Sequence, residues 1–248
     1  MEQIIVRDLG RMEYKAAWDI QDGIFQAMVG RKLAGRGVGA GREGRPSHHL
    51  LFCEHDPVVT IGKSGNEQNL LASAELLRNM GIGFYRNNRG GDITYHGPGQ
   101  VVGYPILDLD CFFTDIHRYL RFLEEVIILA MADYGLKGDR LPGSTGVWMD
   151  PGDLVRARKI CAIGVRTSRW VTMHGFAFNV NTDLRHFDLI VPCGITGKQV
   201  TSMQRELGRE IDTDEVKSAI VSHFGKVFGA AMTAAPKGRT MPAHPHGA

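Results

Sequence analysis

Short strand-like segments outnumber helical segments along this chain of 248 residues, and the two kinds do not alternate regularly. Apolar residues recur at helical spacing near residues 13–29, 68–80, 115–134 and 212–228. Strand-like runs fall near residues 3–8, 49–54, 58–61, 82–86, 145–149, 159–166 and 170–180. Because a doubly wound parallel sheet requires regular strand–helix alternation, this order predicts an α+β fold with a mixed sheet flanked by helices.

The length favours a single domain, which we place at residues 1–230. Six glycines and five basic residues between positions 30 and 47 predict a flexible loop within it. Residues 231–248 are rich in Pro, Gly, Ala and His and predict a disordered tail. Asp115, and either Asp212 or Thr213, are the expected N-caps of the third and fourth helices.

Charge and composition exclude several classes of protein. Lys and Arg total 29 against 27 Asp and Glu, so a strongly basic nucleic-acid binder is not expected. No apolar run is long enough to span a membrane and the first residues are charged, so we expect a cytoplasmic protein without membrane association. The four cysteines form no CxxC pair and no His or carboxylate cluster has metal-site spacing, so we expect neither a disulfide scaffold nor a bound metal.

Two apparent nucleotide-binding motifs fail on inspection. Gly39–Gly44 matches GxGxxG, but a predicted helix precedes it where the motif requires a strand. Gly62, Lys63 and Ser64 resemble the end of a phosphate loop, but Pro57 stands where its first glycine belongs. The sequence therefore predicts no cofactor.

Glycine is in excess, at 31 residues, and part of the excess gathers in the segment RGGDITYHGPGQ, residues 89–100. Glycines allow backbone to approach a ligand closely and to aim N–H groups into a concavity. The alternative is a tight hairpin between strands at 92–95 and 101–105. A hairpin needs one or two glycines rather than four flanked by Arg89 and His96, which favours a binding loop.

Two further segments carry side chains that are unusual in a scaffold. Lys159 lies in the apolar strand RKICAIGV, and alternation places it on one face with Cys161 and Ile163 if no bulge intervenes. A buried ammonium needs a partner, although a lysine on an edge strand that reaches solvent is an alternative. Cys193 lies between Pro192 and Gly194, a turn context that would leave the thiol approachable or simply without a role. Spacing alone does not establish that Lys159 and Cys193 meet.

At these residues the chain resembles the LipB family, the octanoyltransferases or lipoyl(octanoyl) transferases of lipoate biosynthesis. Four motifs carry the resemblance, and two more, EHDPVVTIG (54–62) and VTS (200–202), extend it. They are RGGDITYHGPGQ (89–100), RKICAIGV (158–165), TMHGFAFNV (172–180) and PCGI (192–195). The resemblance covers roughly residues 50–205 and implies a fold similar to the catalytic domain of biotin and lipoate protein ligases.

The resemblance also implies a reaction and its residues. Octanoyl would pass from acyl carrier protein to Cys193 as a thioester, and then to a lysine ε-amine of a lipoyl domain as an amide. Lys159 corresponds to the lysine that lowers the pKa of the thiol and moves protons. The acyl pocket maps onto Arg89, Gly90, Gly91, Asp92, Ile93, Thr94, Tyr95 and His96, onto Ala162, Ile163 and Gly164, and onto Gly175, Phe176 and Ala177. Cys161 stands where small residues are common in the family and is expected to be a bystander.

The implied partners are octanoyl-acyl carrier protein as donor, and the lipoyl domains of 2-oxoacid dehydrogenase complexes and the glycine cleavage H protein as acceptors. The conversion of a thioester to an amide is downhill in free energy, so no ATP is needed. The expected reaction also involves no cofactor and no metal. The chemistry needs a nucleophile, an oxyanion site and a proton carrier. Ile163 and Phe176 are expected to line an eight-carbon slot.

Three alternatives stay open at this point. An ATP-dependent lipoate or biotin protein ligase on the same fold would carry GRGRRG or RRxSGGG at the glycine-rich segment, and would not need the thiol of Cys193. A catalytically inactive module that docks an acyl carrier is disfavoured because Lys159 and Cys193 are both present. A cysteine hydrolase lacks a Cys/His/Asn signature, although His96 and His174 are conceivable bases.

Overall fold

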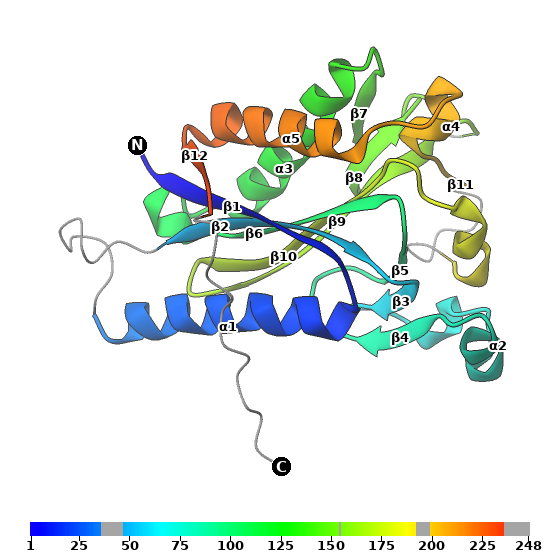
Figure 1. The fold of residues 1–248 in the computed structure, drawn as a ribbon, viewed down its shortest axis with the longest axis horizontal. Coiled ribbons are helices and arrows are strands. Elements are labelled where there is room, and N and C mark those ends of the chain that lie inside the picture. Colours follow the sequence, from blue (N-terminus) through cyan, green and yellow to red (C-terminus); the bar gives the residue numbers. More distant parts are fainter. Residues whose placement is uncertain (36–46, 154, 192–198, 236–248) are drawn as a thin grey trace.

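The computed structural model describes residues 1–35, 47–153, 155–191 and 199–235. Within them two sheets form the framework (Figure 1). The strands are β1 (Gln3–Met12), β2 (His48–His55), β3 (Val58–Ile61), β4 (Gly83–Arg86), β5 (Ile93–His96), β6 (Gln100–Ile106), β7 (Gly138–Leu141), β8 (Ser144–Met149), β9 (Arg158–Ser168), β10 (Val171–Asn179), β11 (Gln199–Val200) and β12 (Ala231–Ala234). The helices are α1 (Tyr14–Leu33), α2 (Ala74–Asn79), α3 (Ile116–Ala132), α4 (Met203–Leu207) and α5 (Thr213–Phe228), with 3-10 turns at Glu67–Asn69, Leu109–Cys111 and Leu184–Leu189.

The larger sheet is mixed, which confirms the predicted fold class. Its strand order is β12-β1-β2-β6-β10-β9-β8-β7, and β11 pairs with β9 outside that path. β1 is parallel to both β2 and β12, and β11 is parallel to β9, whereas β6, β10, β9 and β8 run antiparallel to their neighbours along the main path. The smaller sheet has the order β4-β3-β5.

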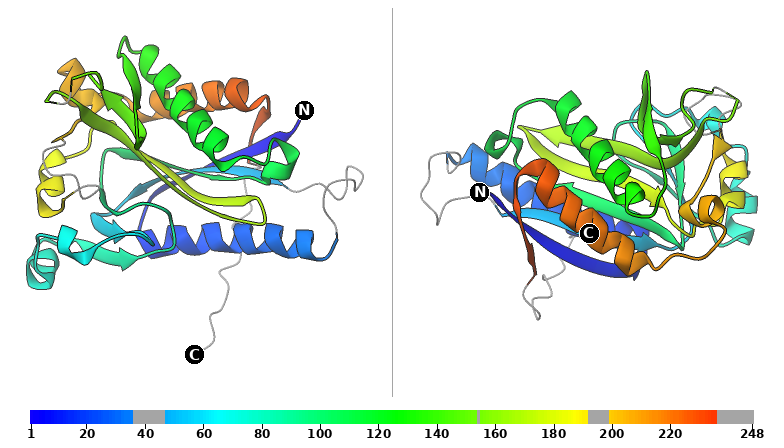
Figure 2. Two further views of the ribbon diagram at one scale, coloured as in Figure 1. Left: turned by 180° about the vertical axis from the view of Figure 1, so that it is seen from behind. Right: turned by 90° about the horizontal axis from the view of Figure 1, so that it is seen from above.

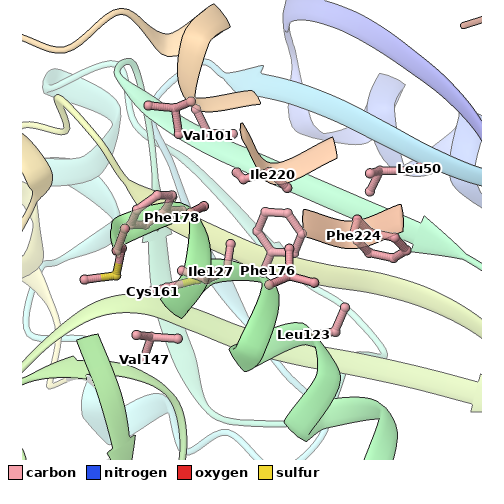
Figure 3. Packing of buried hydrophobic residues seen from close by; sticks show 14 of the residues in the cluster. Leu50, Val101, Leu123, Ile127, Val147, Cys161, Phe176, Phe178, Ile220 and Phe224 are labelled. Carbon is pink, nitrogen blue, oxygen red and sulfur yellow. The ribbon is translucent and has the colours of Figure 1, made fainter. Parts of the chain in front are cut away.

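Helices cover both faces of the larger sheet (Figures 1 and 2). α3 and α5 lie on one face, over a core in which Phe176, Phe178 and Cys161 point toward Leu123 and Ile127 of α3 (Figure 3). α1 lies on the opposite face, with Ile24, Phe25 and Met28 packed against β2, β6 and β10. The predicted flanking of a mixed sheet by helices is therefore correct.

Local sequence signals place the helix starts well. Asp115 accepts a hydrogen bond from the Arg118 N–H, and Asp212 from the N–H groups of Asp214 and Glu215, so both are N-caps. The predicted helix over 68–80 is instead divided into the 3-10 turn at Glu67–Asn69 and α2, because Ser73 caps a new helix. Among the described residues, none of the helices is both long and apolar enough to cross a membrane.

Two predicted boundaries are wrong. α1 continues through Gly30 to Leu33, so the loop expected at 30–47 begins later, and its part from 36 to 46 lies outside the described residues. Ala231–Ala234, assigned to the tail, form β12 because backbone pairing with β1 orders them despite their weak strand propensity. The rest of the expected tail, 236–248, lies outside the described residues.

The hairpin alternative for the glycine-rich segment is also wrong. β5 pairs with β3 in the smaller sheet, whereas β6 pairs with β2 and β10 in the larger one. The glycine-rich run thus passes the chain from one sheet to the other.

Candidate active site

A pocket lies where the two sheets meet. Its lining includes thirteen residues that the sequence assigned to the site, supplied by the 89–96 segment, β9 and β10. They are Arg89, Gly91, Asp92, Ile93, Thr94, His96, Lys159, Ala162, Ile163, Gly164, Gly175, Phe176 and Ala177. The structure therefore brings three segments that are distant in sequence together at one pocket.

The glycine-rich loop is held directly against β9. The Gly90 N–H donates to the Val165 carbonyl at 2.8 Å, and a Cβ at Gly164 would lie 2.7 Å from the Gly90 oxygen. Gly91 has a φ of +89°, a conformation that side chains strongly disfavour. Glycine at 164 is thus a steric requirement of the close approach between loop and strand.

Arg89 anchors the same loop to the smaller sheet. It is buried, and its Nη2 donates to the Thr60 carbonyl at 2.9 Å and to the Thr60 Oγ1 at 3.0 Å. Asp92 fastens the other end of the loop by accepting hydrogen bonds from the Asn66 N–H and the Asn69 side chain. Both charged residues border the pocket while their hydrogen bonds hold its wall.

Gly90 and Tyr95 were expected in the pocket, but they do not line it. Tyr95 is 1% exposed and its ring contacts His186 and Phe187, so alternation along β5 turns it away from its neighbours Thr94 and His96. Burial raises the pKa of Tyr95 to about 12. The Gly90 backbone bonds to β9, as described above. Both residues support the pocket wall from behind.

A buried hydrogen-bond chain runs from Arg89 through His96 toward β11. Gln100 donates through Nε2 to the Tyr95 carbonyl and to Asn179 Oδ1, so its Oε1 is the acceptor for His96 Nδ1 at 2.8 Å. The proton of the neutral ring therefore lies on Nδ1. The unprotonated Nε2 faces the hydroxyl of Thr60 at 3.4 Å. Asn179 continues the chain by donating to the Thr201 carbonyl at 3.0 Å.

Burial keeps the imidazoles of the site neutral. Desolvation, with nearby positive charge, lowers the pKa of His96 and of His174 to about 3 each. His55, whose Nε2 lies 2.5 Å from the Tyr104 hydroxyl, has its pKa lowered to about 4, also mainly by desolvation. At neutral pH the pocket therefore presents the rings of His96 and His174 as hydrogen-bonding groups rather than as cations, and His55 lies outside its lining.

The structure separates Lys159 from Cys161. Val147 pairs with Cys161 and the adjacent Trp148 with Lys159, so β9 has one extra residue, Ile160, at a bulge. The bulge places Lys159 in the pocket and Cys161 in the core beneath α3 (Figure 3). The prediction that Lys159 and Cys161 share a face of the strand required that no bulge lie between them. Because a bulge is present, that prediction is wrong for Lys159 and Cys161. Cys161 is fully buried, and desolvation raises the pKa of its thiol.

The two residues expected to line an apolar slot have a double role. Ile163 and Phe176 border the pocket, and both also pack against the core under α3 and α5. The Phe176 ring lies directly over Gly103, where a Cβ would come within 2.1 Å of it. On the α1 side, Tyr14, Val102 and Tyr104 complete the apolar lining.

Cys193 lies outside the described residues, as does the rest of 192–198. Both flanks of that segment are described. The Val191 N–H donates to the Asn69 carbonyl at 2.7 Å. On the other side β11 pairs with β9, so that Val200 lies opposite Lys159, and Val200 also lines the pocket.

Sequence reasoning did not assign several lining residues to the site, among them Tyr14, Gln100, Tyr104, Asn179 and His174. Gln100, Asn179 and His174 stand inside the recognised motifs, which was the available signal. His174 has a φ of +60° within β10, and its Nε2 lies 2.7 Å from Asn88 Oδ1. Tyr14 and Tyr104 lie outside those motifs and had no local signal.

One group of ligand-type side chains is close enough to hold a metal among the described residues. Glu2, His48 and Cys111 bring their ligand atoms within 4.8 Å of one another, and none of them lines the pocket. However, the Asp108 N–H donates to His48 Nδ1, so the neutral ring carries its proton on Nε2, the atom that faces Glu2. That tautomer is a hydrogen-bond donor rather than a metal ligand.

Comparison with known proteins gives one consistent family. The model of the lipoyl protein ligase A/B catalytic domain matches residues 13–225. The octanoyltransferase of Christiangramia forsetii is 56% identical over 230 residues, 92% of this chain and 97% of that protein. The octanoyltransferase of Flavobacterium johnsoniae is 56% identical over 233 residues, 92% and 98% of the two chains.

Two solved structures share the fold. Lipoate-protein ligase A bound with ATP has a TM-score of 0.73 at 17% identity, covering 96% of this chain and 90% of that one. A bipartite lipoate protein ligase from Thermoplasma acidophilum has a TM-score of 0.72 at 17% identity, covering 96% and 89%. At this identity the likeness concerns the fold, and it confirms the predicted similarity to lipoate protein ligases.

Proposed function

Because this chain belongs to the lipoyl protein ligase A/B catalytic-domain family, and within it to the octanoyltransferases, we propose that it transfers octanoyl from octanoyl-acyl carrier protein to a lipoyl-domain lysine. The enzyme is an acyltransferase. The acceptors in this proposal are the lipoyl domains of 2-oxoacid dehydrogenase complexes and the glycine cleavage H protein, in the cytoplasm. One observation carries the proposal: Lys159, six residues of the 89–96 segment and the 175–177 segment line a single pocket.

In the first half-reaction the Cys193 thiolate attacks the thioester carbonyl of the donor. A new carbon–sulfur bond forms to Cys193, the bond to the carrier's sulfur breaks, and the carrier leaves as a thiol after taking a proton. In the second half-reaction the acceptor amine attacks the enzyme thioester, and an amide forms as Cys193 leaves. Lys159 carries the proton between the two steps, so the enzyme returns to its starting state.

The position of Lys159 supports its role in this scheme. An ammonium near Cys193 favours the thiolate, since a free thiol of pKa ~8.5 is only slightly ionised at neutral pH. Lys159 lies in the pocket, and β11, which follows the Cys193 segment after five residues, pairs with β9 beside Lys159. The rings of His96 and His174 are neutral and hydrogen-bonded to Gln100 and Asn88, so neither ring supplies this positive charge. Arg89 also borders the pocket, but its guanidinium is hydrogen-bonded to Thr60, and the proposal therefore assigns the role to Lys159.

The deciding experiment incubates the protein with octanoyl-acyl carrier protein alone and measures the intact mass. We expect one added octanoyl group on the peptide that contains Cys193, without ATP. The adduct must be lost in Cys193→Ser and kept in the matched control Cys161→Ser, whose thiol lies in the core. An adduct that persists in Cys193→Ser refutes the nucleophile.

Lys159→Ala tests the proton carrier. Alkylation of Cys193 by iodoacetamide should shift to higher pH in this variant and stay unchanged in the control Lys137→Ala, which removes an exposed lysine. An unchanged pH profile in Lys159→Ala removes Lys159 from its role. If product forms only from free octanoate and ATP, the enzyme is a ligase and the transferase proposal fails.

A further inference from the structure

The side chain of Lys159 is held by an aromatic platform. Its Nζ lies 4.7 Å from the ring centroid of Trp148, within the range of a cation–π interaction. Trp148 is 2% exposed, and it is the register partner of Lys159 on the neighbouring strand β8. The indole is therefore a fixed surface under the ammonium rather than a mobile surface side chain.

The backbone beside this platform is shaped to let the lysine pass. Gly146 has a φ of +116°, and a Cβ there would lie 2.5 Å from the Cys161 oxygen and 3.5 Å from Lys159 Cε. The Lys159 side chain thus runs past Gly146 toward the face of Trp148. Any larger residue at 146 would be strained by its φ and would clash with the Cys161 carbonyl, which lies on the same strand as Lys159.

A buried carboxylate holds β8 in this position. Glu124 of α3 is fully buried, and its Oε1 accepts the Gly146 N–H at 3.0 Å. Its Oε2 accepts from Arg140 Nε at 3.0 Å, so the carboxylate is paired as well as hydrogen-bonded. The hydrogen bond from Gly146 to Glu124 and the bulge at Ile160 together hold β8 in its register with β9.

We propose that Trp148 is the positioning residue of this active site: its indole face holds the Lys159 ammonium in the pocket, where it acts on the thiol of Cys193. This inference rests on the proposed function. A lysine stem has several rotatable bonds, and the ring restricts it to conformations that keep the ammonium in the pocket. At the strength of a partly exposed cation–π contact, loss of the ring should lower the population of that state roughly two- to fivefold.

The first readout does not depend on catalysis. Ring currents of Trp148 should shift the ε-methylene protons of Lys159 upfield in the NMR spectrum of the full-length protein, with the signal assigned by its absence in Lys159→Arg. Trp148→Leu should return the signal to the ordinary lysine position, and Trp148→Phe should retain part of the shift. An ordinary lysine shift in the unsubstituted protein overturns the proposal.

The second readout is the pH dependence of Cys193 alkylation by iodoacetamide, followed on the tryptic peptide 186–198, in which Cys193 is the single cysteine. In Trp148→Leu the rate at neutral pH should fall roughly two- to fivefold, and Trp148→Phe should recover most of it. In a Lys159→Ala background Trp148→Leu should cause no further change, because the ring acts through the lysine. Thermal unfolding of each variant identifies any that fails to fold. If Trp148→Leu does not fold, the alkylation rate of Trp148→Phe is compared with that of the unsubstituted protein instead.

The outcomes separate this proposal from the proposed function. If Lys159→Ala shifts the alkylation profile and Trp148→Leu does not, Lys159 keeps its role and Trp148 is refuted as a positioning residue. If the two substitutions act additively, Trp148 acts by another route and the proposal is also refuted. If Lys159→Ala leaves the alkylation profile unchanged, the role of Lys159 in the proposed function is refuted, and the positioning role of Trp148 is refuted as well.

Discussion

Replacement of Gly164 by Ala tests the close contact on which the pocket depends. The new Cβ would lie 2.7 Å from the Gly90 oxygen and 3.3 Å from Arg89 Cδ. The first neighbour is backbone, so no side-chain rotation relieves it, and the loop must withdraw by roughly 0.5 Å. That movement stretches the Gly90–Val165 hydrogen bond, now 2.8 Å, and strains the bond from Lys63 N–H to the Arg89 carbonyl, now 2.9 Å.

The cost should be visible in both stability and activity. Overpacking of this kind costs roughly 1–3 kcal/mol, which for a domain of this size lowers Tm by roughly 3–10 °C. Displacement of the loop that carries Arg89 and His96 should lower kcat/KM by roughly 10- to 100-fold, because catalytic geometry tolerates little misplacement.

The assay measures octanoyl transfer from octanoyl-acyl carrier protein to a lipoyl domain by the mass of the acceptor. Gly30→Ala is the matched control, because Gly30 is exposed in α1 with nothing within 4 Å of its notional Cβ. That control should gain roughly 0.5–1 kcal/mol from helix propensity and keep full activity. A Gly164→Ala enzyme with the activity and Tm of the unsubstituted protein refutes the steric argument.

Three more predictions concern two buried residues, Gln100 and Cys161, and the half-buried His49. Gln100→Leu removes the acceptor of His96 Nδ1 and the donor to Asn179, so urea unfolding should show a loss of roughly 2–5 kcal/mol; a loss below 1 kcal/mol would contradict the network. Cys161→Ala should cost about 1 kcal/mol, and native Cys161 should resist iodoacetamide because burial raises the pKa of its thiol; rapid labelling of Cys161 would contradict its core position. Burial lowers the pKa of His49 to about 4, below its ordinary 6.5. The unfolded chain therefore takes up a proton at His49 at a higher pH than the folded protein does. The free energy of unfolding should accordingly fall as the pH falls from 6.5 to 4, by up to ~1.4 kcal/mol per pH unit. His49→Gln should flatten the decline in unfolding free energy over that interval, and an unchanged slope would show that the ring titrates freely.

Most of the secondary structure could be predicted because its causes are local. Asp115 and Asp212 cap the helices that follow them, and the apolar spacing in α3 and α5 matches one buried face. The glycine-rich motif identified the segment that approaches the pocket, and the motifs around Lys159 and His174 identified two of its strands. Features set by neighbours in the chain are visible in the sequence itself.

What alternation alone could not predict is the face on which a residue lies when strand pairing is irregular. Period-two reasoning joined Lys159 to Cys161, but the bulge at Ile160 depends on how β8 pairs with β9. The order of Ala231–Ala234 likewise depends on β1, more than two hundred residues away.

The ability of a side chain to attack, to carry a proton or to admit close backbone contact belongs to its residue type and its immediate neighbours, so candidates for these roles can be named from the amino-acid sequence. Which of the candidates share one pocket depends on strand pairing in three dimensions. Gln100 meets Asn179 and His96 meets Thr60 because two sheets join at the glycine-rich crossing, and the strand register that brings them together is a property of pairing between distant segments.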